Sequence, residues 1–483
     1  MQVENQIPAP TRCRPERLLF PSGVQNVHVV GLCGSGIRGI VQILRERGLK
    51  VSGSELLDSP VLEKFRLTGM DCRVGHSSGN LAQDTNLVLI SAAVQDSNPE
   101  VQAAVTRRIP VLKYAQVLGR LMAEKNGIAI AGTHGKTTTT AMVSLILTEA
   151  GLDPTFVIGG EYPALGGSSH LGKGEFFVAE ACEFDRSFLN LQPKMSIVTN
   201  IEEDHLDYFK SLKEIQGAFA DFVSLLPEDG FLVLNRDDPN SSYLSEFCRS
   251  AVGTFSLRAK GADWWAEEIL PESGGSCFSM VSQSGEQTRV RLRVPGLHNV
   301  SNALAATAVC RRAGVPLETI SAVIERFTGV RRRFDILCRK KVFVIDDYAH
   351  HPTEIHMVLR AARQSMPDRR LVAVFQPHQH SRLRMFRDRF ADVLSRFDMV
   401  FVTEVFRARD KEEDVRTVHS DSLVETMRYN NPDGLISYTP TFDDVLQSLR
   451  RNVNAGDAVI FLGAGSITDL ARRYAEEVSG DAE

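Results

Sequence analysis

A lysine between glycines and threonines, at the end of an apolar run, could bind phosphate. In IAIAGTHGKTTTT the apolar residues stop at Gly132, Lys136 follows Gly135, and four threonines begin at Thr137. A strand that turns into a helix here would direct backbone N–H groups and the positive end of the helix dipole at one spot. Lys136 could then place a charge on phosphate oxygens, and the Thr137 hydroxyl could bind Mg²⁺.

This loop lacks the first glycine of the usual G-x-x-x-x-G-K-[ST] pattern, because Ile130 stands five residues before Gly135. The alternative interpretation is a tight strand-to-helix turn with an exposed lysine. The coincidence of two glycines, a lysine and a threonine run at such a turn favours nucleotide binding.

Acidic and polar residues follow the next two predicted strands. The segments FFVAEACEFD and SIVTNIEEDHLDYF supply Glu180, Glu183, Asp185, Asn200, Asp204, His205 and Asp207. Since parallel strands present their carboxyl ends at one edge of a sheet, these groups could hold a divalent ion beside the lysine loop. Any one acid could instead be a solvated loop residue or a helix cap.

A second glycine turn, GSGIRG from Gly34 to Gly39, follows an apolar strand and precedes a helical pattern, with Glu55 about twenty residues on. The pattern alone is typical of a dinucleotide fold and would suggest an NAD-dependent oxidoreductase. The same geometry binds any diphosphate at a helix N-terminus. The separate phosphate loop at 132 favours a different diphosphate compound here.

Several regular elements must position these loops. Apolar runs, polar turns and amphipathic stretches recur along the 483 residues, which predicts parallel sheets covered by helices. Strands are expected at 176–180, 196–200 and 231–235, an antiparallel extension at about 252–294, and further strands at VFVIDD, LVAVF, DMVFV and AVIFL. We expect three domains, at 1–124, 125–332 and 333–483, with the arginine-rich FTGVRRRFDI as a hinge that could contact anions.

Composition excludes some classes of protein. The chain has 55 Lys+Arg and 60 Asp+Glu, a net charge of −5, which argues against a dedicated nucleic-acid binder. Its eight cysteines show no zinc-ligand spacing. No apolar run reaches the ~20 residues of a membrane helix, and the N-terminus lacks a signal-peptide core. We expect a cytoplasmic protein without membrane insertion, a monomer or a homodimer.

Motifs spread in order along nearly the whole chain resemble the Mur ligase family. They are GLCGSGIRGI with VSGSE, SAAVQDSNPE, AGTHGKTTTTAM, VAEACEFDRSFLNLQP, TNIEEDHLDYF, PGLHNVSNALAA, RRRFDI, DDYAHHPTEI, FQPHQHSRLR and GAGSI. The resemblance implies three α/β domains: a Rossmann-like UDP-sugar domain, a central P-loop-type ATPase domain with a small antiparallel extension, and a C-terminal Rossmann-like domain. It implies an ATP-dependent ligase of peptidoglycan precursor synthesis. Such an enzyme would join L-alanine to the carboxylate of UDP-N-acetylmuramate through an acyl phosphate, which makes the carboxyl oxygen a good leaving group.

The resemblance also implies a role for each matching residue. ATP would be bound by Gly132, Thr133, His134, Gly135, Lys136, Thr137, Thr138, Asn299, Asn302, Arg333 and Asp347. The UDP-sugar would be bound by Gly34, Ser35, Gly36, Ser54, His76 and Ser91. Thr137 and Glu180 would hold Mg²⁺, and His205 would ligate a second metal ion, where the imidazole could also admit Mn²⁺. The catalytic set would be Lys136, Glu180, His205, His350 and Arg382, with Arg384 alongside. Alternatively, His350 and His351 cap the helix near Pro352, and Arg382 is a surface residue.

Some positions depart from the family's pattern. Cys182 and Phe184 replace an acid and a serine, Gln379 stands where an arginine is expected, and Arg331 replaces a glycine. These changes bear on amino-acid specificity more than on the reaction. The alternatives are a ligase of the same family that attaches a whole tripeptide to the same sugar, the NAD-dependent oxidoreductase, and a nucleotide-gated binding protein without catalysis.

Overall fold

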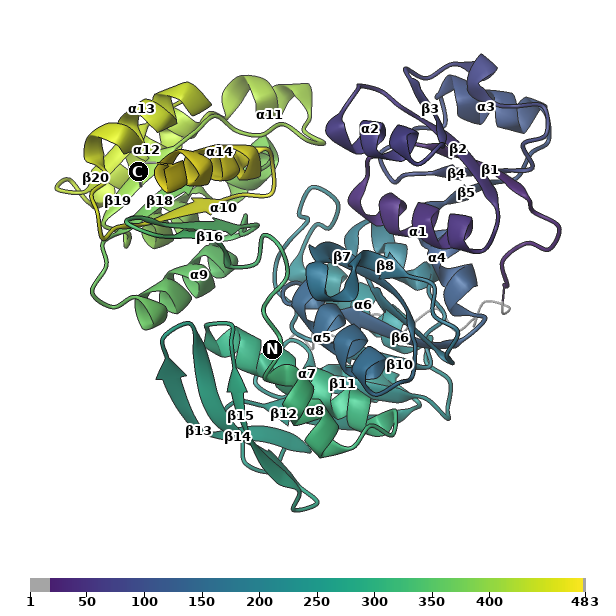
Figure 1. Ribbon diagram of the computed structural model, residues 1–483, viewed down its shortest axis with the longest axis horizontal. Coiled ribbons are helices and arrows are strands. Elements are labelled where there is room, and N and C mark those ends of the chain that lie inside the picture. Colours follow the sequence, from purple (N-terminus) through teal and green to yellow (C-terminus); the bar gives the residue numbers. More distant parts are fainter. Residues whose placement is uncertain (1–17, 481–483) are drawn as a thin grey trace, which may run out of the picture. The chain divides into compact units, whose positions relative to one another are not determined.

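The computed structural model describes residues 18–480 (Figure 1). Residues 1–17 of the first predicted domain and 481–483 of the third lie outside the described residues. The chain divides into two compact units. The first comprises residues up to 202, 213–265 and 303–323, and the second comprises 203–212, 266–302 and the residues from 324 onward. Within 18–480, no helix is long and apolar enough to cross a membrane.

The first sheet has five parallel strands in the order β3-β2-β1-β4-β5. The strands are β1 (Asn26–Val30), β2 (Lys50–Glu55), β3 (Asp71–Val74), β4 (Leu87–Ile90) and β5 (Val111–Lys113). The helices are α1 (Ser35–Glu46), α2 (Pro60–Leu67), η1 (Ser78–Asn80), α3 (Pro99–Thr106) and α4 (Tyr114–Met122). The strand order reverses at β1, and α/β sheets bind ligands at the carboxyl ends of the strands beside such a point.

The second sheet runs β15-β14-β13-β12-β11-β10-β6-β9-β7-β8. Its strands are β6 (Asn126–Ala131), β7 (Thr155–Tyr162), β8 (Gly167–His170), β9 (Phe176–Glu180), β10 (Met195–Val198), β11 (Phe231–Asn235), β12 (Ala251–Ser256), β13 (Trp264–Glu272), β14 (Gly275–Ser282) and β15 (Gln287–Leu292). The helices are α5 (Lys136–Glu149), η2 (Pro163–Leu165), η3 (Phe184–Asn190), α6 (Leu212–Val223), η4 (Ser242–Phe247), α7 (Leu297–Arg312) and α8 (Leu317–Ile324). The central strand β6 pairs in parallel with both β9 and β10, so the loops after these three strands meet at one edge.

The third sheet has the order β16-β17-β21-β18-β19-β20, with β16 antiparallel to β17. Its strands are β16 (Asp335–Arg339), β17 (Phe343–Asp347), β18 (Leu371–Phe375), β19 (Met399–Val402), β20 (Leu435–Tyr438) and β21 (Ala458–Leu462). The helices are α9 (Pro352–Ser365), α10 (His380–Leu394), α11 (Glu412–Thr417), α12 (Ser420–Asn430), α13 (Phe442–Asn452) and α14 (Ile467–Gly480).

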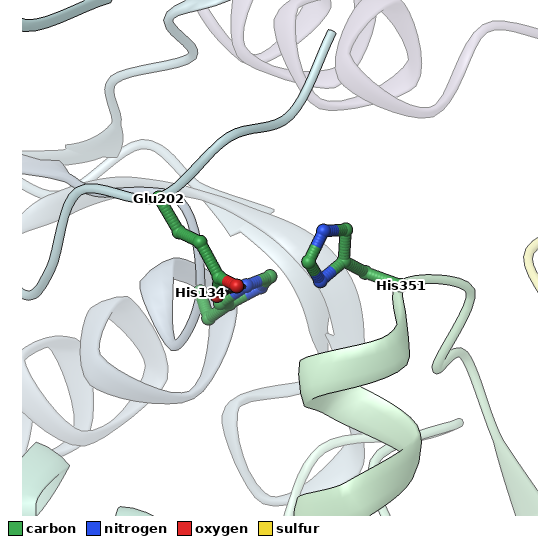
Figure 2. A group of neighbouring side chains, drawn as sticks. All are labelled: His134, Glu202 and His351. Atoms are coloured by element: carbon green, nitrogen blue, oxygen red, sulfur yellow. Dashed lines mark hydrogen bonds and ion pairs between the residues drawn. The ribbon is translucent and has the colours of Figure 1, made fainter. Parts of the chain in front are cut away.

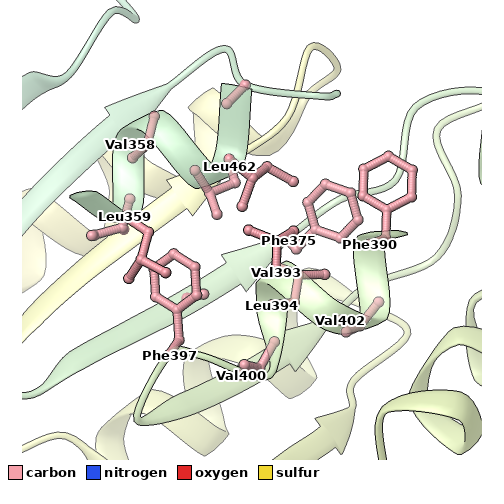
Figure 3. Close-up of a cluster of buried hydrophobic side chains, with 14 of the residues drawn as sticks. Val358, Leu359, Phe375, Phe390, Val393, Leu394, Phe397, Val400, Val402 and Leu462 are labelled. Atoms are coloured by element: carbon pink, nitrogen blue, oxygen red, sulfur yellow. The ribbon is translucent and has the colours of Figure 1, made fainter. Parts of the chain in front are cut away.

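The third sheet has a hydrophobic core on each of its two faces, because successive side chains of its strands point to opposite faces. Phe375 and Leu462 pack with apolar residues of α9 and α10 (Figure 3), and the same cluster includes Leu423, Val424 and Met427 of α12. Their neighbours Val374 and Phe461 belong to the opposite cluster, with α13 and α14. Successive side chains of a strand point to opposite faces, so strands buried on both faces read as continuous apolar runs.

The α/β fold with three sheets confirms the predicted fold class. The strands expected at 176–180 and 231–235 are β9 and β11. In the expected antiparallel extension, β14 and β15 do pair antiparallel, whereas β12 and β13 pair in parallel through two residues each. The domain boundaries at 124/125 and 332/333 stay a prediction.

Candidate active site

The glycine–lysine loop lies between β6 and α5, and its backbone requires glycine at two positions. Gly132 has φ 132° and Gly135, the N-cap of α5, has φ 84°. A Cβ on Gly132 would lie 2.0 Å from Thr199 Oγ1. Residues with a side chain rarely adopt such φ values, and here the neighbouring strand end leaves no space for one. The two glycines therefore allow the backbone to turn tightly into α5. The N–H groups at the start of this helix are available to an anion.

Asn200, at the end of the neighbouring strand β10, fixes the loop. Its backbone oxygen accepts from Thr133 N (2.9 Å), and its side-chain oxygen accepts from His134 N (3.0 Å). Its amide group donates to His134 O at 3.0 Å. These three hydrogen bonds give Asn200 a structural role among the polar residues that sequence reasoning grouped after β10.

Lys136, the first residue of α5, is held in place by a buried carboxylate. Its Nζ lies 2.9 Å from Glu183 Oε2 and donates to Thr133 O at 3.0 Å and to Gly132 O. Only 3% of the Glu183 side chain is exposed. Burial alone would lower the pKa of Lys136, but the charge and hydrogen bonds of Glu183, with Glu180 nearby, outweigh it and raise the pKa. Lys136 therefore remains a cation at the mouth of the loop.

Thr137 and Glu180 bring two oxygen groups together beside this lysine. Thr137 Oγ1 donates to Glu180 Oε2 at 3.2 Å, and Gly159 N donates to Glu180 Oε1. A hydroxyl and a carboxylate are the hard oxygen ligands that Mg²⁺ prefers. This donor set therefore fits Mg²⁺, and the assignment of these two residues as its ligands stays a prediction.

His134 and Glu202 form a further pair beside the loop. His134 Nε2 and Glu202 Oε2 are 3.1 Å apart, and Figure 2 shows the carboxylate lying against the imidazole. His351, also drawn there, begins α9 in the second unit. The sequence assigned His134 to the nucleotide loop and did not indicate its acidic partner.

The third predicted metal ligand, His205, lies in the segment 203–212, which groups with the second unit. Its backbone has φ 52°, a left-handed conformation. The preceding residue, Asp204, forms an ion pair with Arg382 Nη2 at 2.9 Å, and both side chains are at least nine-tenths buried. Burial would raise the pKa of Asp204, but the charges of His205 and Arg382 hold it well below its usual range. Arg382 is therefore a buried, charged residue and not a surface one.

Three further candidate residues of the second unit, His351, His350 and Arg384, make different kinds of contact. His351 is the N-cap of α9 and forms a capping box with Glu354, so the alternative that sequence reasoning left open is correct for it. His350 Nδ1 lies 3.0 Å from Tyr348 O and 3.2 Å from Glu354 Oε2. Arg384 points outward with 59% of its side chain exposed and pairs with Asp414. Arg384 is therefore exposed, whereas Arg382 is buried.

The predicted adenine-side residues, Asn299 and Asn302, are buried at the start of α7. Asn299 donates to Pro295 O (2.7 Å), and Asn302 donates to Asn299 Oδ1 (3.3 Å). The two amides therefore order each other.

Asp347, at the end of β17, accepts hydrogen bonds from Phe334 N (2.7 Å) and Ala349 N (2.8 Å). Burial raises the pKa of Asp347 to about 7, against the charge of Arg333, which lowers it. The guanidinium of Arg333 stacks over the ring of Tyr348, 5.0 Å from its centroid. The structure thus brings Arg333 and Asp347 together in the second unit.

The first sheet carries the other glycine turn. Gly34 is the N-cap of α1 and Ser35 is its first residue. A Cβ on Gly36 would lie 2.7 Å from the ring of Tyr114. A Cβ on Gly31 would lie 2.7 Å from Ser91 Oγ, so the predicted Ser91 does lie beside this turn. Glu55, the acid that completes the dinucleotide-type pattern, accepts a hydrogen bond from Cys33 N at 2.8 Å.

Ser54 and His76 also meet at this edge, with Ser54 Oγ 3.0 Å from His76 Nδ1. Gly31 N and Leu32 N both donate to Ser54 O, which ties the end of β2 to the glycine turn. Behind them lies Glu100, a fully buried acid on α3 that sequence reasoning missed. No signal in the sequence indicated this burial, because an acid just after Asn-Pro is typical of an ordinary first-turn helix residue.

The departures from the family pattern differ in how constrained their positions are. Phe184 begins η3, and the next two residues, Asp185 and Arg186, have φ 53° and 50°. Gln379 is the N-cap of α10 with φ 69°, is 1% exposed, and has no hydrogen-bond partner for Nε2 among residues 18–480. Arg331 is half exposed and pairs with Asp335 at 3.2 Å.

Two glycine turns at the carboxyl ends of separate parallel sheets, one of them carrying a lysine beside a hydroxyl–carboxylate pair, define a multidomain α/β nucleotide-dependent enzyme. Three family models cover most of the chain: "Mur ligase family, catalytic domain" at 26–126, "Mur ligase middle domain" at 130–310, and "Mur ligase, glutamate ligase domain" at 332–465. The chain belongs to the Mur ligase family.

Individual relatives extend along nearly the whole chain. The UDP-N-acetylmuramate–L-alanine ligase of Acetivibrio thermocellus is 39% identical over 463 residues, 95% of this chain and 97% of that protein. The structure is similar to that of the UDP-N-acetylmuramate-alanine ligase from Thermotoga maritima, with a TM-score of 0.80, 28% identity, and coverage of 94% of this chain and 99% of that one. The murein peptide ligase from Psychrobacter arcticus gives a TM-score of 0.71 at 25% identity, covering 95% of this chain and 100% of that one.

Proposed function

We propose that the chain is an ATP-dependent ligase that joins L-alanine to the carboxylate of UDP-N-acetylmuramate. The observation that carries the nucleotide part is Lys136, held as a cation at the start of α5 beside Thr137 and Glu180. The choice of substrates is supported by the 39% identity to an L-alanine ligase over nearly the full length of both chains.

In the proposed reaction, a carboxylate oxygen of the sugar attacks the γ-phosphorus of ATP, and ADP leaves with the electrons of the broken P–O bond. The alanine amine then attacks the acyl carbon of the resulting acyl phosphate. The tetrahedral adduct collapses as phosphate leaves, and the amine gives up a proton. Covalent activation thus replaces one difficult step by two easier ones.

The lysine loop would position and neutralise the triphosphate. The N–H groups at the start of α5 would face the phosphates, and Lys136 would exchange part of its contact with Glu183 for the β- and γ-phosphate oxygens. Thr137 and Glu180 would hold Mg²⁺, which when bound supplies positive charge to those oxygens. Phosphoryl transfer requires mainly positioning and charge neutralisation, which this geometry offers.

The other predicted residues keep their proposed roles. His205 would ligate a second metal ion, either Mg²⁺ or Mn²⁺. Asn299, Asn302, Arg333 and Asp347 would serve the nucleotide. Gly34, Ser35, Gly36, Ser54, His76 and Ser91 would hold the UDP-sugar. His350 and Arg382 would serve the sugar carboxylate, the phosphate and the alanine, since arginine suits oxyanions.

The test is ADP release with omission of one component at a time. We expect ADP only when UDP-N-acetylmuramate, ATP, a divalent metal ion and L-alanine are all present, and an inactive complete mixture with folded protein would reject the proposal. The metal arm compares Mg²⁺ with Mn²⁺ and with chelator. Competition between L-alanine and L-alanyl-γ-D-glutamyl-meso-diaminopimelate decides between the proposed ligase and the tripeptide ligase. Calorimetry with NAD and ATP tests the oxidoreductase alternative, which requires NAD binding without ATP binding.

A further inference from the structure

Glu100 is the centre of a buried hydrogen-bond network in the first sheet. One carboxylate oxygen, Oε2, accepts from His28 Nε2 (3.1 Å) and from Ser54 Oγ (2.6 Å). The other, Oε1, accepts from Ser77 N (3.1 Å) and from the side-chain amide of Asn80. Burial alone would raise the pKa of Glu100, but these four hydrogen bonds hold it at about 2. The side chain is therefore ionised although it is fully buried.

An ionised carboxylate has no proton to give, so each of its partners must be a donor. The single hydroxyl proton of Ser54 is therefore committed to Glu100. The contact of 3.0 Å between Ser54 Oγ and His76 Nδ1 then has only one possible direction, from Nδ1–H to the serine oxygen. Glu100 thus fixes the position of a proton on a histidine through an intervening hydroxyl group.

In the neutral imidazole, a proton on Nδ1 leaves a lone pair on Nε2. Among residues 18–480, none donates a hydrogen bond to His76 Nε2, and the side chain is 16% exposed. His76 follows β3, whose carboxyl end lies at the same edge of the sheet as the glycine turn. Ser54 O, at the end of β2, is bound to that turn by hydrogen bonds from Gly31 N and Leu32 N. A ligand whose diphosphate lies on that turn would present its nucleoside or sugar to this edge.

We propose that Glu100 is a positioning residue for the sugar nucleotide: through Ser54 it holds His76 in the Nδ1–H form, so that Nε2 accepts a hydrogen bond from an N–H or O–H group of the ligand. This inference rests on the proposed function for the identity of the ligand. The fixed proton itself can be measured without any ligand.

Two variants break the network at different points. Glu100→Gln replaces one carboxylate oxygen by an NH₂ group, which would face two hydrogen-bond donors. The Ser54 hydroxyl then no longer has an ionised carboxylate as its acceptor. Ser54→Ala removes the middle link and leaves Glu100 its other three donors. The matched control is Val101→Ala on the same helix, a 4%-exposed core residue whose truncation destabilises the domain but spares the network.

The first measurement is the tautomer of His76, read from ¹⁵N–¹H correlation spectra of the ¹⁵N-histidine-labelled full chain without ligand, with the signal assigned by its loss in His76→Gln. We expect a protonated Nδ1 and an unprotonated Nε2 in the wild type and in Val101→Ala. We expect loss of that preference in Glu100→Gln and Ser54→Ala. A wild-type proton on Nε2, or the same tautomer in all variants, would overturn the inference whatever the enzyme's substrates are.

The second measurement is steady-state ADP release with UDP-N-acetylmuramate as the varied substrate. We expect Glu100→Gln and Ser54→Ala to raise KM for that substrate on the order of tenfold, with kcat within about twofold and KM for ATP unchanged. Val101→Ala should lower the urea midpoint and leave all three constants unchanged. An equal rise of KM in Val101→Ala would assign the effect to stability and refute the positioning role. A wild type inactive with this substrate would count against the proposed function instead, and the tautomer measurement would still decide the inference.

Binding of UDP, N3-methyl-UDP and 2′-deoxy-UDP to the wild type and to His76→Ala distinguishes the possible donors. If the uracil N3–H is the donor, only the methylated analogue loses the affinity that depends on His76. If the ribose hydroxyl is the donor, only the deoxy analogue does. Binding of all three with the same ratio between wild type and His76→Ala would overturn the acceptor role of Nε2 toward the nucleoside.

Discussion

Replacing Lys136 by methionine separates the lysine's action on phosphate from its part in the fold. The wild-type ammonium lies 2.9 Å from the 3%-exposed Glu183 carboxylate. The variant keeps the length of the side chain but leaves that carboxylate buried and unpaired. Breaking a buried pair in this way costs about 3–5 kcal/mol of unfolding free energy. Loss of the charge on the transferring phosphate should lower kcat by on the order of 100-fold to 1000-fold.

The double variant Lys136→Met/Glu183→Gln removes both charges together, and a neutral pair of similar volume restores much of a buried pair's stability. We therefore expect the double variant to regain most of the lost unfolding free energy in urea but none of the lost turnover. Glu183→Gln alone should keep measurable turnover, because the cation remains. The assay is ADP release under saturating substrates, paired with urea unfolding of each variant. Recovery of turnover in the double variant would show that Lys136 acts only through folding, and the phosphate role would be refuted.

Other perturbations test separate parts of the structure. Gly36→Ala places a Cβ 2.7 Å from the Tyr114 ring, so KM for the sugar nucleotide should rise on the order of tenfold with ATP binding unchanged in calorimetry; equal loss of both would contradict separate sites. Asp347 keeps its proton to about pH 7 when folded but loses it near pH 4 when unfolded, so its contribution to stability falls as pH rises between these values. In urea unfolding, Asp347→Asn should gain up to about 1.4 kcal/mol per pH unit on the wild type over that window, and a flat difference would argue against a raised pKa. Arg382→Met should cost about 3–5 kcal/mol by leaving its buried partner unpaired, whereas Arg396→Met, whose partner Asp392 is exposed, should cost under about 0.5 kcal/mol.

The sequence predicted the sheets well because their strands are buried on both faces. The runs FFVAE and FLVLN match β9 and β11 residue for residue, since such strands show as unbroken apolar segments between turns. The pairing within the 252–294 segment was harder to predict. The partner of a short strand depends on contacts distant in sequence, and β12 with β13 turned out parallel through only two residues each.

Some features of the candidate site could likewise be predicted from the sequence, and others could not. Glycine turns are visible in sequence because only glycine fits φ values such as those of Gly132 and Gly135. The polar partners that hold the loops are not visible, since Asn200 and Glu183 reach Lys136 and its turn only after three strands have aligned side by side. His351 matched its cap interpretation because a capping box is local in sequence.

Glu183 and Glu100 act in the same way at two sites: each is a buried carboxylate that orients the groups around it. Each is a carboxylate almost fully removed from water, which is costly unless its oxygens accept hydrogen bonds from donors. That requirement orients the donors: Lys136 is drawn to the mouth of one glycine turn, and the Ser54 hydroxyl is turned so that His76 must donate to it. A buried acid therefore determines how a neighbouring residue of the proposed site is oriented. It follows that a neutral, nearly isosteric substitution at either acid should impair the site more than its distance from the substrates suggests, and a mutational scan restricted to ligand-contacting side chains would overlook both.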